Sequence, residues 1–105
     1  MVSQEAIRDL SSRIAREFSP DKIVLFGSYA CGTASEDSDV DLLVILPFEG
    51  RSMRKSLEIL NTVDPHFSVD LLARRPDDTA RRYVAGDPLI REALDHGVAL
   101  YERGG

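Results

Sequence analysis

Two aspartates, Asp39 and Asp41, stand two positions apart at the start of an apolar run, residues 42–46. Side chains at positions i and i+2 of a strand point to the same face, so these carboxylates are expected to lie side by side at the beginning of a buried strand. Two carboxylates held together repel each other and raise each other's pKa. A hard divalent cation relieves that repulsion, and Mg²⁺ is the usual choice where phosphates are also present. The pair therefore predicts a metal site.

A glycine–serine pair, Gly27 and Ser28, follows another apolar run and precedes Asp39 by ten intervening residues. Glycine lets a backbone approach an anion closely. Amides that open a short helical turn, here those of Ser28 and Tyr29, are donors without an intrahelical partner, and the Ser28 hydroxyl adds one more. Gly27, Ser28 and Tyr29 are therefore the candidate residues for binding the phosphates of a nucleoside triphosphate.

A third carboxylate, Asp70, interrupts the apolar run of residues 67–72, where an unpaired charge would be costly. Projecting into the same site, it could share a metal with Asp39 and Asp41 and take the proton from an attacking hydroxyl. Three carboxylates with two metal ions form a clamp for in-line displacement at phosphorus. The alternative is an ion pair of Asp70 with Arg74 or Arg75.

Periodic apolar patterns predict the elements that position these residues. Apolar residues at three- and four-residue steps favour helices, and short continuous apolar runs favour buried strands. The expected order is a helix at 3–18, a strand at 22–26, a helical turn at 29–32, a strand at 39–46, a helix at 52–63, a strand at 67–73, helices at about 75–84 and 87–96, and a strand at 98–101.

This order predicts an α/β (α+β) fold, in which helices pack on a small mixed sheet of about four strands within a single domain, residues 1–105. The connection between the first two strands suits either orientation of the pair. Met53, Leu57, Leu60 and Val63 are expected on the inward face of their helix, and Gly97 is expected to end the last helix as a C′ glycine.

The composition of the chain argues against several classes of function. The formal net charge of −5 argues against direct nucleic-acid binding, which needs a basic surface, and leaves room for a basic protein partner. Cys31 is the only cysteine, so an intrachain disulfide is ruled out, and the usage fits a reducing cytoplasm. The sequence shows neither the apolar core of a signal peptide nor an apolar run long enough to span a bilayer.

Three other interpretations of the acidic segment compete with a catalytic one. A solvated strand start would need neither the glycine–serine pair nor Asp70. An EF-hand loop beginning at Asp37 requires glycine and glutamate where Leu42 and Phe48 stand. A P-loop beginning at Gly27 requires lysine where Thr33 stands. The spacing therefore favours the metal and phosphate interpretation.

The pattern of Gly27 and Ser28, ten residues, then Asp39 and Asp41 resembles the signature of the DNA polymerase β-like nucleotidyltransferase superfamily. The chain length and the ending REALDHGVALYE resemble the minimal nucleotidyltransferases, the MNT antitoxins that pair with HEPN toxins. The resemblance covers residues 22–102 and implies a nucleotidyltransferase-like fold.

The resemblance also implies an activity. Members of this group use Mg²⁺, here two ions held by Asp39, Asp41 and Asp70, and ATP or another nucleoside triphosphate as substrate. The implied reaction transfers AMP onto a tyrosine of a HEPN-domain partner and so acts as an antitoxin. One departure stands out: many relatives carry GSxARG, whereas this chain has Cys31 in place of the arginine. A thiol cannot make the bidentate phosphate contact of a guanidinium, which favours a second hypothesis, a catalytically weak binding module that neutralises its partner by occlusion.

Overall fold

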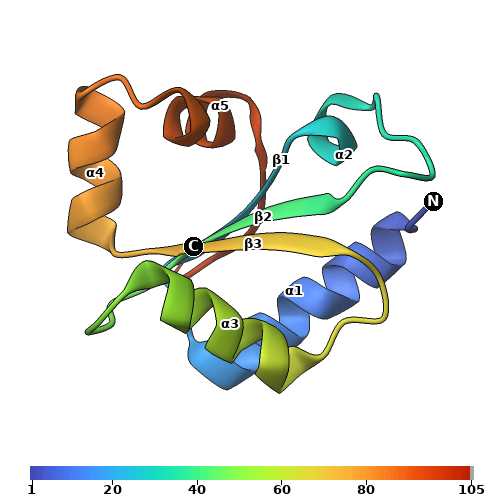
Figure 1. Cartoon of the computed structure of the whole chain (residues 1–105), viewed down its shortest axis with the longest axis horizontal. Coiled ribbons are helices and arrows are strands. Elements are labelled where there is room, and N and C mark those ends of the chain that lie inside the picture. Colours follow the sequence, from blue (N-terminus) through green and yellow to red (C-terminus); the bar gives the residue numbers. More distant parts are fainter. Residues whose placement is uncertain (105) are drawn as a thin grey trace.

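A computed structural model describes residues 1–104 and arranges them around one four-stranded sheet with strand order β3-β2-β1-β4 (Figure 1). The elements in chain order are α1 (Gln4–Phe18), β1 (Lys22–Phe26), α2 (Ser28–Cys31), β2 (Val40–Ile45), α3 (Ser52–Val63), β3 (Val69–Arg74), α4 (Pro76–Val84), α5 (Pro88–His96) and β4 (Val98–Glu102). The predicted α+β class, with a mixed sheet of four strands, is confirmed.

Strand orientation, which the sequence leaves open, differs along the sheet. β1 pairs antiparallel with both β2 and β4, whereas β2 and β3 run parallel. A parallel pair needs a long crossover, and α3 supplies it between β2 and β3. The two central strands, β1 and β2, are therefore flanked by partners on both sides, and β3 and β4 form the edges.

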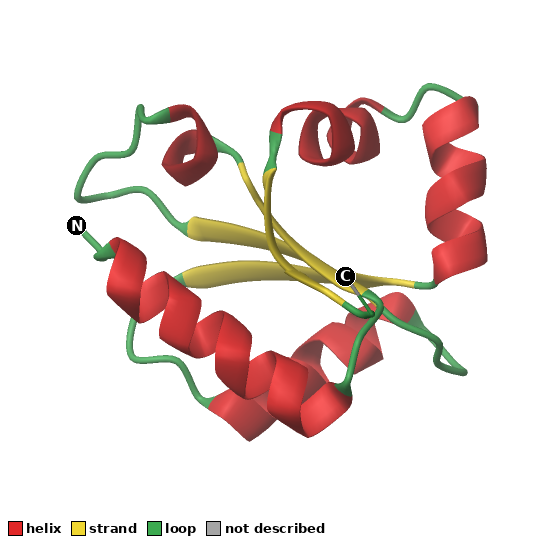
Figure 2. Ribbon diagram, turned by 180° about the vertical axis from the view of Figure 1, so that it is seen from behind, coloured by secondary structure: helices red, strands yellow, loops and turns green. Residues whose placement is uncertain are grey.

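The helices form a layer on each face of the sheet (Figure 2). Buried residues of α1 and α3 pack with one set of strand side chains, and α5 packs with the other set. β1 is buried at every position after Lys22, as its continuous apolar run predicts. Within residues 1–104, no helix is both long and apolar enough to cross a membrane.

Side-chain caps fix the beginnings of two helices. The Ser3 hydroxyl accepts a hydrogen bond of 3.1 Å from the Ala6 amide at the start of α1. The Asp87 carboxylate accepts bonds from the amides of Leu89 and Ile90, at 3.0 and 3.2 Å, at the start of α5. Each cap satisfies donors that the first turn of a helix leaves unpaired.

The inward face predicted for α3 is wrong for two of its residues. Met53 and Leu57 are 76% and 54% exposed, and α3 buries Ser56, Ile59 and Val63 instead. On the buried side, the Ser56 hydroxyl accepts a 2.9 Å hydrogen bond from the Ala73 amide of β3, and Ile59 and Val63 join the core. This bond and the burial of Ile59 and Val63 hold the Ser56 side of α3 toward the sheet, and Met53 and Leu57 stay exposed.

Gly97 follows α5, but not as the left-handed C′ glycine that the sequence suggests. Its φ of −79° and ψ of 175° are extended and open to any residue. The requirement for glycine is space, because a Cβ atom there would lie 2.3 Å from the Ala93 carbonyl and 2.7 Å from the Leu25 carbonyl. Gly97 therefore lets the chain pass from α5 to β4 close against β1.

Candidate active site

Asp41 and Asp70 occupy facing positions on the two parallel strands. Asp41 of β2 is the register partner of Asp70 of β3. Leu43 and Leu72, two residues further along each strand, both pack in the cluster beneath α5, so the two carboxylates project from that same face. The structure therefore brings Asp41 and Asp70 side by side. Arg74 and Arg75 do not pair with Asp70: Arg74 donates to the Ala73 carbonyl, and Arg75 pairs with Asp77.

Asp39 lies one residue before β2 and is exposed. Its Oδ1 accepts a hydrogen bond of 2.5 Å from the Ser68 hydroxyl, and the Ser68 carbonyl accepts a bond of 3.0 Å from the Val40 amide. Ser68 therefore ties the start of β3 to the acidic segment through both its backbone and its side chain. Among residues 1–104, no three Asp, Glu, His or Cys side chains are grouped as a ready-made metal cage.

Gly27 joins β1 to α2 in a backbone conformation that only glycine adopts readily, with φ 74° and ψ −152°. A Cβ atom at this position would lie 2.2 Å from Oδ2 of Asp41. The glycine corner and the acidic pair, separated in sequence, are therefore in direct contact. The Asp41 carboxylate occupies the space that a side chain at position 27 would need.

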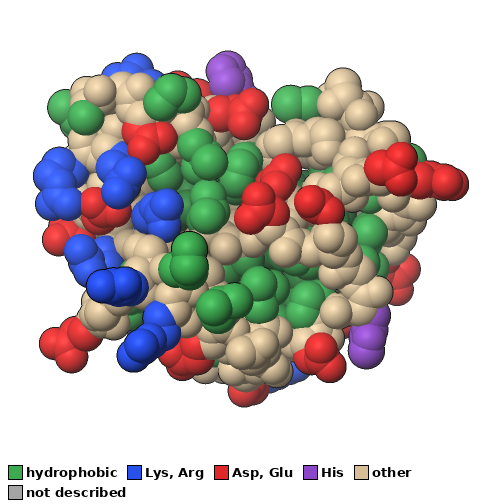
Figure 3. All heavy atoms as spheres, in the orientation of Figure 1, with side chains coloured by type: hydrophobic (Ala, Val, Ile, Leu, Met, Phe, Trp, Pro, Cys, Tyr) green, Lys and Arg blue, Asp and Glu red, His purple; other side chains and the backbone are tan. Residues whose placement is uncertain are grey.

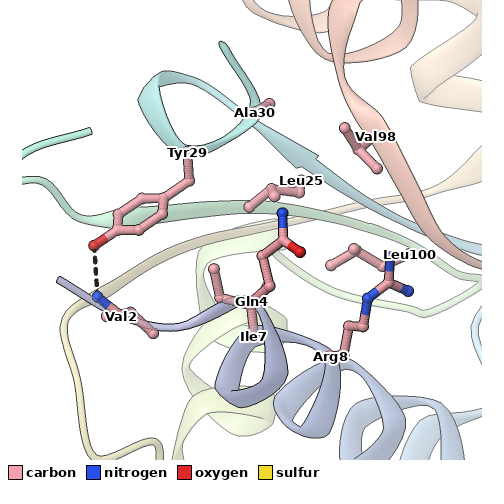
Figure 4. A pocket seen from close by; sticks show the side chains of 9 residues that line it. All are labelled: Val2, Gln4, Ile7, Arg8, Leu25, Tyr29, Ala30, Val98 and Leu100. Atoms are coloured by element: carbon pink, nitrogen blue, oxygen red, sulfur yellow. Dashed lines mark hydrogen bonds between the residues drawn. The ribbon is translucent and has the colours of Figure 1, made fainter. Parts of the chain in front are cut away.

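Ser28 and Tyr29 begin α2, a helix of four residues. The amides of Ala30 and Cys31 both donate to the Gly27 carbonyl at 3.1 Å, whereas those of Ser28 and Tyr29 belong to the open first turn. The Tyr29 side chain packs against the cluster beneath α1 and α3, and its hydroxyl accepts a 3.0 Å bond from the Val2 amide, just before α1 (Figure 4). Only the backbone of Tyr29 is therefore available to a ligand at the glycine corner.

The charges at this corner act on Asp41. Burial raises the pKa of the Asp41 carboxyl, and the neighbouring charges of Asp70, Asp39 and Glu92 raise it further, in that order. Acidic side chains gather over the N-terminal ends of β2 and β3, with hydrophobic side chains on either side of them (Figure 3). The site is therefore a patch of concentrated negative charge.

Two residues of this neighbourhood are absent from the sequence-based prediction. Ser68 carries no recognisable signal except its place two residues before Asp70. Glu92 belongs to α5 and reaches the field of Asp41 only because α5 packs over β1. The sequence does not show where α5 docks, so the effect of Glu92 on Asp41 could not be predicted from it.

The chemistry of the donor set suits a hard divalent cation, although Asp39, Asp41 and Asp70 do not form a closed three-carboxylate cage within residues 1–104. All the candidate ligands are carboxylate oxygens, the type that Mg²⁺ prefers. The raised pKa of Asp41 reflects a burial and repulsion penalty on its charged form, and a cation would offset that penalty. Asp39, Asp41 and Asp70 would hold the metal, with Ser68 fixing the orientation of Asp39.

Removal of the Ser68 hydroxyl is expected to weaken Mg²⁺ binding about tenfold, because outer-shell partners that orient a metal ligand contribute this much. The measurement is a calorimetric Mg²⁺ titration of Ser68→Ala in the presence of AMP-PNP. Ser68→Thr, which keeps the hydroxyl, is the matched control and should bind as the wild type does. Equal affinities for the alanine and wild-type proteins would contradict the positioning role.

The mixed sheet, its helical layers and the acidic pair beside a glycine corner place the protein in a structural class, the nucleotidyltransferase-like α+β domains. The family model described as "Nucleotidyltransferase domain" matches residues 7–100, so the chain belongs to this family. The resemblance drawn from the sequence is thereby confirmed. No curated protein matches the chain.

Solved structures share the fold. A Sulfolobus solfataricus protein described as a nucleotidyltransferase is 16% identical with a TM-score of 0.66, covering 94% of this chain and 79% of its own. A toxin–antitoxin structure with AMP-PNP is 22% identical with a TM-score of 0.60, covering 92% and 74%. A complex of a tri-AMPylated Shewanella oneidensis HEPN toxin with its MNT antitoxin matches at 19% identity and a TM-score of 0.56, covering 95% and 73%. At these identities the likeness concerns the fold.

Proposed function

We propose that this protein is an Mg²⁺-dependent nucleotidyltransferase that moves AMP from ATP to a hydroxyl of a HEPN-domain partner, a tyrosine in the favoured case, and thereby acts as an antitoxin. The observation that carries the proposal is the contact between Gly27 and Asp41, with Asp70 in register beside it. This contact places the proposed phosphate-binding residues at Gly27 and Ser28 next to the carboxylates of Asp41 and Asp70. Membership of the nucleotidyltransferase family supports the reaction class.

Each residue then has a chemical task. The amides of Ser28 and Tyr29 and the Ser28 hydroxyl bind phosphate oxygens of the nucleotide. Asp70 accepts the proton of the acceptor hydroxyl as its oxygen bonds to the α-phosphorus and pyrophosphate leaves. Bound Mg²⁺ would offset the charge on the phosphates and on the leaving pyrophosphate. Asp39 and Asp41 would hold the metal beside Asp70.

The structural neighbours and the net charge support the choice of partner. One structural neighbour is an MNT antitoxin in complex with a tri-AMPylated HEPN toxin, and another toxin–antitoxin structure contains AMP-PNP. The net charge of −5 suits a basic protein surface, because complementary charge speeds association and excludes wrong partners. A HEPN-domain protein encoded beside this chain is therefore the acceptor to test.

The test is label transfer from α-³²P-ATP to that HEPN protein in the presence of Mg²⁺. The wild-type chain should label it, and the double variant Asp39→Ala/Asp41→Ala should not. Asp37→Ala is the matched control, since Asp37 is an exposed aspartate of the same loop outside the paired strands. Equal labelling by the wild type and the double variant would refute the enzymatic proposal.

A second candidate function, neutralisation by occlusion with little catalysis, is favoured by Cys31. This residue is exposed at the end of α2, where the arginine of GSxARG would extend near the phosphates. Under this alternative, the Asp39→Ala/Asp41→Ala variant still suppresses the partner's toxicity and calorimetry detects no tight ATP–Mg²⁺ binding. A Mg²⁺-dependent affinity for ATP that Asp41→Asn abolishes would decide for the enzyme.

As the pH falls, Mg²⁺ binding should begin to weaken at a higher pH than it would if the metal ligand were an aspartate with an ordinary pKa. The metal needs the ionised carboxylate, and the raised pKa of Asp41 lets protons compete earlier as the pH falls. Stability of the metal-free protein changes in the opposite sense. A folded-state pKa above the unfolded one gives a stabilisation that is present at low pH and lost as the pH rises through the folded-state pKa. Calorimetric titrations and urea unfolding across acidic pH check both expectations.

A further inference from the structure

A groove of about 430 Å³ runs between α3 and the outer edge of β3. The exposed Met53 and Leu57 form part of the α3 wall, and Val69 and Leu71 belong to the β3 wall. Hydrophobic side chains gather along this side of the molecule, beside the acidic patch (Figure 3). The groove therefore offers an apolar wall along an edge strand.

The backbone of β3 presents hydrogen-bonding groups to this groove. The carbonyls of Ser68 and Arg74 accept bonds from the β2 side, at the Val40 and Leu46 amides. Alternate residues of a strand point their backbone groups to opposite sides, so Val69, Leu71 and Ala73 point theirs outward. The Ala73 amide is bonded to Ser56 of α3, so Val69 and Leu71 are the remaining outward positions of the edge that line the groove, with Val69 the more exposed and Leu71 only 4% exposed.

The groove reaches the proposed active site at the edge of the sheet, where Asp70 is one of its lining residues although its carboxylate projects to the opposite, α5-side face. Asp70 sits between Val69 and Leu71, with its side chain on the face of the acidic patch. A chain paired with Val69 and Leu71 would therefore pass within a residue of the proposed base.

We propose that an extended, apolar segment of the acceptor protein docks in this groove as an added strand on β3, and so delivers the acceptor hydroxyl to Asp70. This inference rests on the proposed transfer to a protein partner and adds the surface that receives it. Main-chain bonds to Val69 and Leu71 would give affinity, and contact with Met53 and Leu57 would select apolar side chains.

Two other occupants fit the groove less well. A helix satisfies its own backbone groups and would leave the outward amides of Val69 and Leu71 unpaired. A second copy related by a twofold axis would use the same patch on both subunits, bringing the acidic groups beside Asp70 into proximity with their own copies. An extended segment pairs the edge and adds no further negative charge.

Amide hydrogen exchange tests the added strand directly. The full chain is measured by NMR with and without the HEPN protein defined above. The amides of Val69 and Leu71 are expected to slow at least about tenfold in the complex, because a new ladder bond must break before they exchange. The exposed amides of the loop at Asp37 serve as an internal control and should not change. A complex that forms without slowing Val69 and Leu71 would overturn the proposal.

Surface variants test the apolar wall. Met53→Glu and Leu57→Glu should each weaken binding of the HEPN protein by roughly tenfold or more, the scale for an anchoring side chain. Val84→Glu is the matched control, because Val84 is 80% exposed on α4, outside the groove. ATP–Mg²⁺ affinity, measured by calorimetry, should be unchanged in all three variants.

The outcomes separate this proposal from the proposed function. If the wild-type chain transfers label and the groove variants bind and label the partner normally, the docking site is wrong and the enzyme stands. If the wild-type chain binds no ATP, the transferase proposal fails, and slowed exchange at Val69 and Leu71 still supports docking. If it binds ATP but not the HEPN protein, both the proposed partner and this docking surface are refuted.

Discussion

Replacement of Gly27 with alanine is expected to lower the free energy of unfolding by roughly 2–4 kcal/mol and to abolish nucleotide binding. The backbone there has φ 74° and ψ −152°, a region closed to residues with a Cβ, and the added atom would lie 2.2 Å from Oδ2 of Asp41. Either the corner or the carboxylate must move. Urea denaturation and calorimetric titration with AMP-PNP measure the two effects.

Two comparisons separate the steric clash of the added Cβ with Asp41 from the backbone strain at Gly27. Gly86→Ala also introduces a side chain at positive φ, 85°, but its Cβ meets no atom within 4 Å, so it should cost less than Gly27→Ala. The same Gly27→Ala change made in an Asp41→Ala background removes the carboxylate in the way and should recover part of the loss. Equal costs in both backgrounds would show that the glycine is required for the backbone alone.

Asp41→Asn is expected to change activity and stability in opposite directions. Label transfer should fall at least about a hundredfold, because a ligand that positions the metal and the phosphates is lost. The melting temperature of the metal-free protein should rise near neutral pH. The charged carboxylate is partly buried among Asp70, Asp39 and Glu92, and the amide removes that repulsion while keeping the shape.

The control for this trade-off is Asp37→Asn, which removes an equal charge from the exposed neighbouring loop. It should leave both the label transfer and the melting temperature close to those of the wild type. A less stable Asp41→Asn protein would mean that the carboxylate makes stabilising bonds that outweigh its repulsion. An Asp41→Asn protein with full activity would remove Asp41 from the site.

The local features of the fold could be predicted from the sequence because their signals are local. The apolar run of β1, the cap at Ser3 and the Asp87–Pro88 start of α5 each depend on residues within one turn or one strand. The bounds of β1 and α3 agree with the prediction to the residue. The spacing of Gly27 and Ser28 from the aspartates likewise predicted that they share a site, and the structure places Gly27 against Asp41.

Features that depend on how elements dock could not be predicted in the same way. The sequence pattern of α3 favours Met53 and Leu57 as inward residues, but the helix docks with Ser56 bonded to Ala73 and with Ile59 and Val63 in the core. The need for glycine at Gly97 arises from carbonyls of two other elements. The contributions of Ser68 and Glu92 to the site depend on strand register and on the docking of α5.

The position of β4 in the sheet has a consequence for how the protein is made. β1 is synthesised well before its second neighbour, β4, which lies more than seventy residues further along the chain, with Lys22 pairing to Glu102. Until β4 has left the ribosome, β1, which is apolar at every position after Lys22, lacks its second neighbour, and an unprotected apolar edge is a recognised route to aggregation. A translation arrest before Val98 should therefore leave a product that is bound by chaperones and degraded, whereas synthesis through β4 gives β1 its second neighbour.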